Sequence, residues 1–515
     1  MSEESTAKKY LGRYEKAKAY RDNFVPLFEE CIEYTMPQRE SFYDKAAGQR
    51  RDDKIFDETA VVGVQEFASR LQAGIVPNYA RWADLTAGSE IPEDQRDQVN
   101  NDLDAVTEYV FEILQNSNFA QEVHESFMDL AIGTGTLCVE EGDAINPVVF
   151  SAVPLPQVVI DTGPKGNVDH VYRERREIKF SQLEILYPNG TFNDEVRKKM
   201  LGEDTTTVLE VVCRDYSRLN EEVFWHYAIC MTTESLLHKK QLVGLGSNPY
   251  IPFRWGQASG EKYGRGPLIN ALSSIKTTNL VVQFILENAQ MQIAGMYQME
   301  DDGVINPDTI NLVPGTIIPK AMGSAGLQPI NPAGRMDVSQ LVLNDMRNNI
   351  KEALYNQMLG DPNRTPATAT EIAERMADLS RKMGAAFGRL QAELVQPVIQ
   401  RVVYILKKQG RIELPTINGR EVKIRSVSPL AQAQANEDIS SIARFLQLVG
   451  GVFGPEMMQL VIDPEQTAIT LGKKFGVPDS LIRDEEQRKQ IAAAAQQLAQ
   501  MQQQMGAPVE GSQTP

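Results

Sequence analysis

The sequence predicts an α+β fold in which helices predominate. Two observations lead to this expectation. Apolar residues recur three or four positions apart, as on one face of a helix, through much of residues 1–130 and 264–410. Between these parts, residues 131–255 contain short runs of β-branched and aromatic residues, which are typical of strands. At 515 residues and 42% hydrophobic, the chain can bury large cores and form roughly two to four structural units.

The first 130 residues are expected to be mostly helical, and the region that follows is expected to form a sheet. Helical spacing runs through Tyr10–Tyr34 and Phe56–Ile75, and the second of these segments ends before Pro77. Further on, the β-type runs predict an antiparallel sheet with one helix near Ser181–Tyr187. The predicted strands are Thr136–Val139, Pro147–Phe150, Gln157–Ile160, His170–Arg173, Val208–Arg214 and Val223–Ile229.

Two long helices joined by a small β element are predicted next. The first helix follows Pro267, a residue suited to an initial helical turn, and carries a four-heptad apolar stripe with one polar member, Asn279. The second helix is expected over about Val338–Leu359, with apolar residues at intervals of four. The short β-type runs between them are interrupted by prolines. The first stripe consists of Leu268, Leu272, Ile275, Asn279, Val282, Leu286, Ala289, Ile293 and Met296.

A polar loop with two prolines and a much longer helix come after this hairpin. The loop, Gly360–Pro366, cannot continue the preceding helix, and Thr368 with Glu371 matches a capping box that opens a new one. An apolar stripe then continues to about Gly410. Pro397 lies inside this helix, so we expect a kink near Gln396, where the carbonyl four residues before the proline loses its partner. From residue 485 the chain is rich in Ala and Gln and is expected to fray into disorder.

No recognisable catalytic, cofactor or metal motif accompanies these elements. The chain lacks a Walker A motif and a complete dinucleotide-binding glycine loop, and its four histidines have no zinc-ligand spacing. The four cysteines are scattered, which favours a reducing compartment. The formal charge of −17, from 52 basic and 69 acidic residues, argues against a nucleic-acid coat or a binder of anionic membranes. No signal peptide or membrane span is predicted.

The order of these parts suggests a ring. By default, long apolar stripes belong to core helices. Here, however, a helical hairpin with a β tip precedes a proline-bounded loop and a longer kinked helix, which together form a segmented rod. A rod with apolar stripes needs neighbours, and a closed ring of identical subunits supplies them through heterologous interfaces.

Several motifs in this order resemble the portal, or head-to-tail connector, proteins of short-tailed bacteriophages, over at least residues 10–430. One departure is Ala83, because relatives usually place an aromatic residue after the tryptophan. The motifs that carry the resemblance are Leu71–Pro77 followed by Trp82 and Leu85, Gly133–Leu137, Pro252–Trp255 leading into Ser259–Pro267, and Thr368–Ile372 with Arg375.

The resemblance implies a portal fold with wing, stem, clip and crown regions, assembled as a dodecameric ring at one capsid vertex. Carried over by position, the regions are the wing at 1–263, stem helices at 264–299 and 337–360, the clip at 300–336, a tunnel loop at 361–367, a long wing and crown helix at 368–410, remaining wing strands and crown helices at 411–484, and a C-terminal extension at 485–515.

The resemblance also implies partners and candidate site residues. Double-stranded DNA would pass through the channel during packaging and ejection. The partners would be the terminase large subunit, a tail adaptor, the major capsid protein and scaffolding protein, and assembly would take place in the bacterial cytoplasm. DNA-facing candidates are Asn363 and Arg364 in the tunnel loop and Arg347 and Lys351 on the second stem helix. Clip candidates for contact with the adaptor or terminase are Asp308, Thr309, Asn311 and Lys320.

Two other interpretations stay open at this point. One is a soluble hydrolase or transferase whose acidic residues converge in the 131–255 sheet region, which predicts a pocket containing carboxyls with perturbed pKa values. The other is a coiled-coil scaffold without a pore. Arg364 is equally compatible with an ordinary arginine in a solvated surface loop.

Overall fold

The structure is a computed structural model that describes residues 3–43, 52–88, 93–218, 221–294, 297–298, 322, 328–329, 336–356, 382–413, 422–428, 442–449, 451 and 462–475. The chain divides into two compact units. We call them the sheet unit, formed by residues 1–21, 68–265 and 358–515, and the hairpin unit, formed by residues 22–67 and 266–357. Residues 22–67 therefore group with the predicted stem helices rather than with the sheet.

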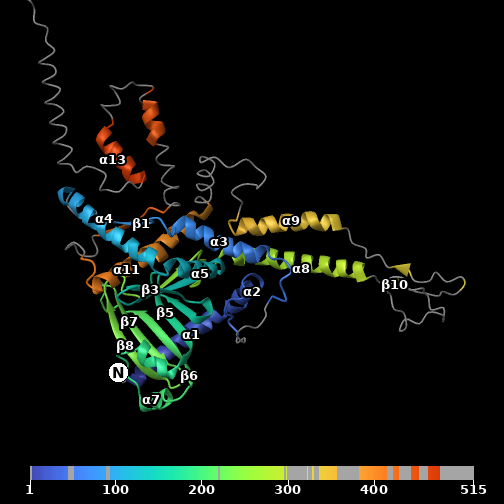
Figure 1. Cartoon of the computed structure of the whole chain (residues 1–515), viewed down its shortest axis with the longest axis horizontal. Coiled ribbons are helices and arrows are strands. Elements are labelled where there is room, and N and C mark those ends of the chain that lie inside the picture. Colours follow the sequence, from blue (N-terminus) through green and yellow to red (C-terminus); the bar gives the residue numbers. More distant parts are fainter. Residues whose placement is uncertain are drawn as a thin grey trace, which may run out of the picture. The chain divides into compact units, whose positions relative to one another are not determined.

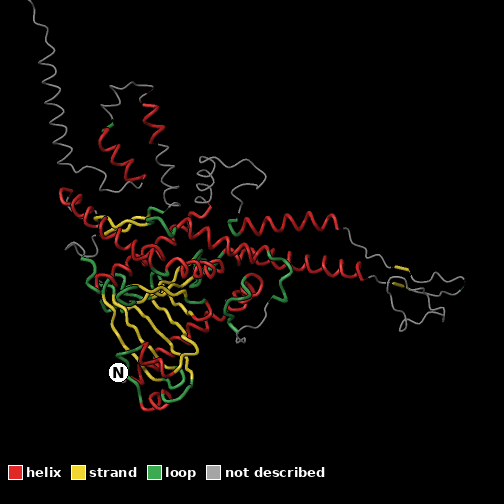
Figure 2. Tube along the Cα trace, in the orientation of Figure 1, coloured by secondary structure: helices red, strands yellow, loops and turns green. Residues whose placement is uncertain are grey.

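Helices predominate in the N-terminal part of the chain, and most strands lie between residues 134 and 254 (Figures 1 and 2). The α-helices are α1 Glu3–Asp22, α2 Val25–Thr35, α3 Thr59–Ile75, α4 Glu93–Asn116, α5 Phe119–Ile132, α6 Leu183–Leu186, α7 Asp194–Met200, α8 Pro267–Ala294, α9 Met336–Ala353, α11 Gln396–Lys408 and α13 Pro464–Phe475. The strands are β1 Ala83–Ala87, β2 Thr134–Glu141, β3 Val148–Ala152, β4 Val158–Thr162, β5 Val168–Lys179, β6 Thr205–Arg214, β7 Val223–Cys230, β8 Ser235–Val243, β9 Tyr250–Arg254, β10 Tyr297–Gln298, β11 Gln328–Pro329 and β12 Val422–Ser426.

The region predicted to be one antiparallel sheet forms two. Strands β4 to β8 pair in chain order as a five-stranded antiparallel sheet, and β2 pairs between β3 and β9 in a three-stranded one. The antiparallel prediction is confirmed, and each of the six predicted runs overlaps a strand. The prediction of a single sheet was wrong, because the strands form two sheets. Strands β8 and β9 and helix α7 were not expected, so the prediction of one helix was also wrong.

Both faces of the five-stranded sheet are covered. On one face, Tyr10 and Tyr14 of α1 pack against Tyr172, Leu209 and Val211. The other face packs against the connection between β5 and β6, with a core formed by Phe180, Leu183, Tyr187, Val196, Val208, Ala228, Cys230 and Leu237. Because neighbouring residues of β6 contribute to opposite faces, burial on both sides explains its nearly continuous apolar sequence.

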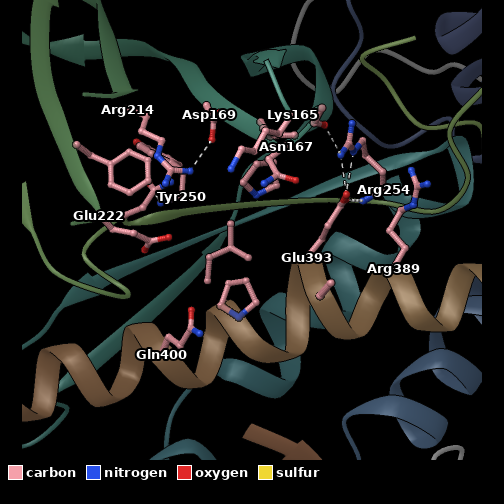
Figure 3. Close-up of a pocket in the computed structure, with 18 of the residues that line it drawn as sticks. Lys165, Asn167, Asp169, Arg214, Glu222, Tyr250, Arg254, Arg389, Glu393 and Gln400 are labelled. Carbon is pink, nitrogen blue, oxygen red and sulfur yellow. Dashed lines mark hydrogen bonds and ion pairs between the residues drawn. The ribbon is translucent and has the colours of Figure 1, made fainter. Parts of the chain in front are cut away.

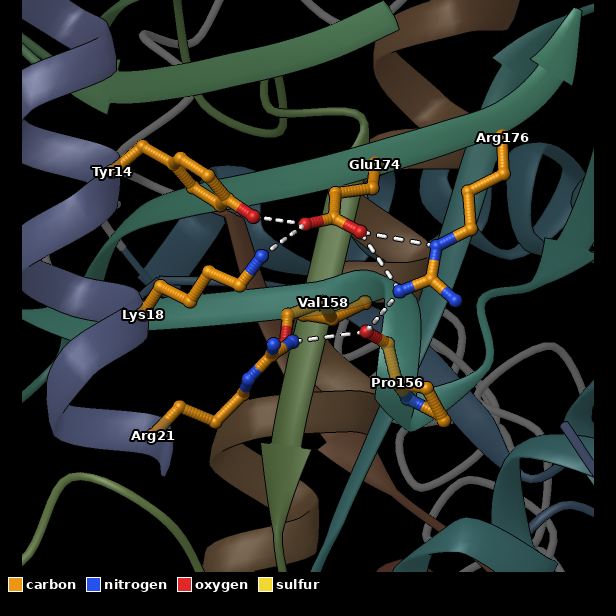
Figure 4. A network of polar contacts seen from close by, with 7 residues as sticks. All are labelled: Tyr14, Lys18, Arg21, Pro156, Val158, Glu174 and Arg176. Atoms are coloured by element: carbon orange, nitrogen blue, oxygen red, sulfur yellow. Dashed lines mark hydrogen bonds and ion pairs between the residues drawn. The ribbon is translucent and has the colours of Figure 1, made fainter. Parts of the chain in front are cut away.

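Polar contacts fix α1 on this sheet (Figure 4). Glu174 of β5 accepts hydrogen bonds from the Tyr14 hydroxyl and from Lys18 Nζ at 3.3 Å. Arg176 donates to the other oxygen of Glu174 at 2.8 and 3.0 Å. Arg21 Nη1 donates to the Pro156 carbonyl at 2.9 Å. Burial alone would raise the pKa of Glu174, but its contacts with Tyr14, Arg176 and Lys18 lower it. The carboxylate therefore stays ionised as a link between helix and sheet.

The helical segment predicted over Tyr10–Tyr34 is interrupted once. Helix α1 ends at Asp22, and α2 begins at Val25, with Pro26 in its first turn. Proline has no N–H to donate and clashes with the carbonyl four residues earlier, so one continuous helix is disfavoured at this position. The same residue is well tolerated at a helix start, which explains why helical structure resumes directly.

The long helix has an irregular turn where the sequence predicted a kink. Residues 382–390 are α-helical, Gln391–Val395 form a π-helical turn, and α11 follows. Pro397 lies at the start of α11. Across the part of the chain that the structure describes, no helix is both long and apolar enough to cross a membrane.

Candidate functional site

The predicted stem corresponds to an antiparallel helical hairpin in the hairpin unit. Helices α8 and α9 lie side by side (Figure 1). The first half of the α8 stripe is buried, including Leu268, Leu272 and Ile275. Farther along the stripe, Leu286 is 53% exposed, and Phe284, which is on the same helix but not a member of the stripe, is 56% exposed. The hairpin therefore presents apolar side chains that the described part of the chain leaves uncovered.

Asn279, the polar member of the stripe, holds the loop before α3. Its Oδ1 accepts hydrogen bonds from the backbone N–H groups of Phe56 at 2.7 Å and Asp57 at 3.1 Å. Its Nδ2 donates to the Lys54 carbonyl at 2.6 Å. Asn279 is buried, and these contacts satisfy its amide at a position where an unpaired polar group would be costly.

Asp57 continues this network to the second helix of the hairpin. One carboxylate oxygen accepts from the Thr59 N–H at 3.0 Å and so caps the start of α3. The other oxygen accepts from Arg347 Nη2 at 2.6 Å and Nε at 2.7 Å. The Asp57 side chain is 4% exposed and that of Arg347 37%. Arg347, a DNA-facing candidate, is thus engaged in supporting the hairpin, whereas the other candidate on this helix, Lys351, is exposed.

Helix α9 ends at Ala353, earlier than the predicted Leu359. Tyr355 has a left-handed backbone with φ of 57°. The N–H groups of Tyr355 and Asn356 donate to the carbonyls of Glu352 and Lys351, at 3.0 and 2.7 Å, as in a Schellman motif. Asn356 Nδ2 also donates to the Gly63 carbonyl at 2.6 Å. This polar anchor on α3 terminates the helix although the apolar spacing continues.

The remaining sequence-predicted site residues lie outside the described residues, and their roles stay predictions. They are Asn363 and Arg364 of the expected tunnel loop, and Asp308, Thr309, Asn311 and Lys320 of the expected clip. Sequence reasoning missed Asp57 and Asn356. An acid two positions before Thr59 is a cap signal that could have identified the first of them.

The sheet unit contains a fully buried carboxylate, Glu210 of β6. It accepts hydrogen bonds from the hydroxyls of Tyr187, at 2.5 Å, and Tyr250. Arg175 Nε lies 3.1 Å from it, and Arg175 also pairs with Glu140 at 2.7 Å. Burial is the largest single influence and would raise the pKa of Glu210. Arg175, His226, Arg173 and the hydrogen bond from Tyr187 together outweigh burial, and the pKa falls to about 2. Because Tyr250 and Glu140 belong to the three-stranded sheet, this cluster joins the two sheets.

A cavity of about 700 Å³ lies in the sheet unit between β9 and the long helix (Figure 3). Its lining carries both signs of charge, including Lys165, Arg389 and Glu222. Burial raises the pKa of Glu222. Among the described residues, no three His, Cys, Asp or Glu side chains are grouped so that they could hold a metal ion.

Comparison with known proteins identifies the family. A family model described as "Bacteriophage head to tail connecting protein" matches residues 7–482. The chain belongs to this family. The connector is 25% identical to the "Probable portal protein" of Bordetella phage BPP-1, over 97% of this chain and 94% of that protein. It is 23% identical to the "Portal protein" of Salmonella phage epsilon15, over 96% and 93% of the two chains.

Other relatives are more distant. The connector is 20% identical to the "Portal protein" of Escherichia phage T7, over 96% of this chain and 90% of that protein. Among solved structures, it is similar to a chain of the "Virion of native gene transfer agent (GTA) particle". The identity is 14% and the TM-score 0.35, over 82% of this chain and 94% of that one.

Family membership confirms the resemblance drawn from the motifs and the general function of a head-to-tail connector, or portal, protein. The connector is a bacteriophage portal-type protein, a structural component of the virion rather than an enzyme. The hydrolase or transferase interpretation is therefore not retained. The perturbed carboxyl that it required does exist at Glu210, but that group is fully enclosed by its partners and joins two sheets.

Proposed function

We propose that twelve copies of this connector form a ring at one capsid vertex, and that the ring encloses a channel for double-stranded DNA. The observation that carries the proposal is the exposed apolar surface of the hairpin. Leu280 is 46% exposed, Phe284 56% and Leu286 53% on α8, and Val342 is 42% exposed on α9.

These side chains support a ring because the residues that the structure describes leave them exposed to water. Full burial of one such side chain is worth about 1.5–3 kcal/mol, so covering half-exposed ones contributes about 1 kcal/mol each. Neighbouring hairpins in a ring use two different faces for contact, and every copy then covers its neighbour. Four residues per subunit, repeated at every interface, would be a substantial driving force for closure.

The charge of the chain supports a channel through which DNA slides rather than binds tightly. DNA carries one charge per roughly 1.7 Å of axis, and a strongly basic wall would hold it by releasing counterions. The connector has a formal charge of −17. In this proposal, local cations position the DNA: Lys351 on α9, and Arg364 beside Asn363 in the 361–367 loop. Arg347 contributes mainly through its ion pair with Asp57.

The docking functions follow from the resemblance. In this proposal, residues 300–336 form the clip, where Asp308, Thr309, Asn311 and Lys320 contact the terminase large subunit during packaging and the tail adaptor afterwards. The ring would assemble in the bacterial cytoplasm with scaffolding and major capsid protein.

Native mass spectrometry of the purified chain tests the ring directly. We expect a dominant species near twelve times 57.4 kDa. The F284E variant should shift this species to monomers and small oligomers, because a charge would enter the hairpin interface. L201E is the matched control, since Leu201 is 92% exposed but lies in the sheet unit. A monomeric wild type, or equal effects of the two variants, would contradict the proposal.

A further inference from the structure

The π-helical turn of the long helix carries a glutamate that is bound to the end of a strand. Glu393 lies in the middle of this turn, Gln391–Val395. Its Oε2 accepts from the backbone N–H of Arg254 at 2.9 Å and from the Nε at 3.2 Å, and its Oε1 accepts from Nη2 at 2.6 Å. Figure 3 shows the two side chains meeting at one end of the cavity. Strand β9 is thus attached to the helix by three hydrogen bonds on one carboxylate.

Arg254 also fixes two other segments of the sheet unit. Its Nη1 donates to the Lys262 carbonyl at 3.2 Å and its Nη2 to the Gly166 carbonyl at 3.3 Å. The Arg254 side chain is 3% exposed and that of Glu393 21%. A buried charge-assisted pair of this geometry is strong, and loss of either partner would leave the other charge poorly solvated. The pair therefore holds the chain that follows β9 together with the long helix.

The alternative to the π-helical turn around Glu393 is a regular α-helical turn. A π-helical turn contains one residue more than the α-helical turn it replaces, and such turns are rare and often occur at functional sites. Here the Gln396 N–H donates to the Gln391 carbonyl, five residues back. In a regular α-helix, the Glu393 carbonyl would accept a hydrogen bond from the N–H of residue 397. Because this residue is Pro397, which has no N–H, a regular turn would not gain that bond. Absorbing the extra residue would rotate the preceding helix by about 100° and move it by about 1.5 Å.

We propose that the Arg254–Glu393 pair is a lock that keeps the long helix in its π-bulged register. The pair can form because the bulge turns Glu393 toward β9, and the bulge is maintained because the pair ties it down. Release of the lock lets the bulge open or migrate, so residues 382–395 exchange between two helical registers. Register shifts of this kind are discrete two-state motions.

The lock has a consequence for DNA translocation that rests on the proposed function. In the sequence, residues 361–367 end 15 positions before residue 382, and the segment fixed by Arg254 leads to Pro267 at the start of α8. In a ring with a channel, a register shift of the long helix would reposition the 361–367 loop. The lock itself does not depend on the ring, and its test uses no property of the channel.

Hydrogen–deuterium exchange of the full-length E393Q variant tests the lock. Glutamine keeps the shape of the side chain but removes its charge. We expect amides of residues 391–396 to exchange at least tenfold faster than in the wild type, while residues 398–408 and the five-stranded sheet keep their protection. The R254K variant should loosen the same turn and, in addition, residues 256–265, because lysine cannot reach the Lys262 and Gly166 carbonyls together with Glu393.

The ion pair between Lys408 and Glu141 supplies a matched control. It joins the other end of the same helix to the three-stranded sheet, and its side chains are 43% and 38% exposed. E141Q should leave the exchange of residues 391–396 unchanged. Unchanged exchange in E393Q, or equal acceleration in E393Q and E141Q, would overturn the proposal. If E393Q does not fold, E393D keeps the charge on a shorter side chain and must show faster exchange confined to the turn.

Discussion

Glu210 offers a direct test of the packing argument for the sheet unit. The substitution E210Q removes one charge and leaves the shape of the side chain unchanged. The Arg175 guanidinium then keeps only Glu140 as an anionic partner, and the Tyr187 and Tyr250 hydroxyls lose a charged acceptor. Because this cluster joins the two sheets, we expect the sheet unit as a whole to be destabilised.

The magnitude follows from the pKa. Folding lowers the pKa of Glu210 from 4.5 to about 2. A difference of one in pKa between the folded and unfolded states corresponds to about 1.4 kcal/mol. The ionised carboxylate therefore contributes about 3 kcal/mol to the free energy of unfolding at neutral pH. This agrees with the loss of about 3–5 kcal/mol that is typical when one partner of a buried ion pair is removed.

Tryptophan fluorescence during urea denaturation measures this loss. All three tryptophans, Trp82, Trp225 and Trp255, belong to the sheet unit, so the signal reports on that unit alone. E140Q is the control, because Glu140 pairs with the same Arg175 but its side chain is 47% exposed. Its loss should stay below about 1 kcal/mol, as for other exposed ion pairs.

The pH dependence provides a second arm of the test. A carboxyl whose pKa is lowered on folding contributes stability above its unfolded pKa, and this contribution is lost as the pH falls through the folded pKa. The difference between wild type and E210Q should therefore be constant from pH 5 to 8 and shrink between 4.5 and about 2. Equal losses in E210Q and E140Q, or a difference that grows on acidification, would refute the reasoning.

Three further predictions concern other parts of the chain. Asn279→Ala leaves the N–H groups of Phe56 and Asp57 without their acceptor, which should lower the free energy of unfolding by about 1–3 kcal/mol. Amide exchange in residues 54–60 should become faster, and unchanged protection there would contradict the prediction. Gly133→Ala places a methyl group 2.1 Å from the Gly264 carbonyl oxygen and should prevent soluble expression. The control is Gly12→Ala, which has open space around the new methyl group and should leave stability unchanged or raise it by up to about 1 kcal/mol. Arg364→Ala should leave ring assembly intact but alter packaging, and normal packaged DNA length with normal infectivity would refute that role.

Elements with strong periodic patterns were predictable from the sequence, and elements stabilised by their neighbours were not. Strand β8 contains His238, Lys239, Lys240 and Gln241, which hides its strand pattern. These residues suit its place at the edge of the sheet, where charge discourages pairing with other chains. Strand β9 is short and contains Pro252, which is tolerated because β9 is also an edge strand.

The support of the hairpin depends on residues that are distant in sequence. Asn279 was visible as the one polar member of an apolar stripe, but the stripe could not show that its partners would be Lys54, Phe56 and Asp57. Arg347 was identified as a charged residue on the second helix, yet its rotation about the helix axis and its pairing with Asp57 depend on the packing of α3. Spacing within one helix therefore identifies a buried face but not the residues that it meets.

The π-helical turn is the instructive intermediate case, because the apolar spacing contains its signal. Leu390, Leu394, Val398 and Val402 are all fully buried at three successive intervals of four. At about 100° per residue, these twelve steps would end about 120° away from the starting face of a regular helix. If one residue is taken up by a π turn, eleven steps end only about 20° away. The burial pattern therefore favours an extra residue between Leu390 and Val402, and Pro397 lies where one helical hydrogen bond is missing in any case. The resulting turn directs Glu393 to Arg254, a contact that no pattern along the helix could have predicted.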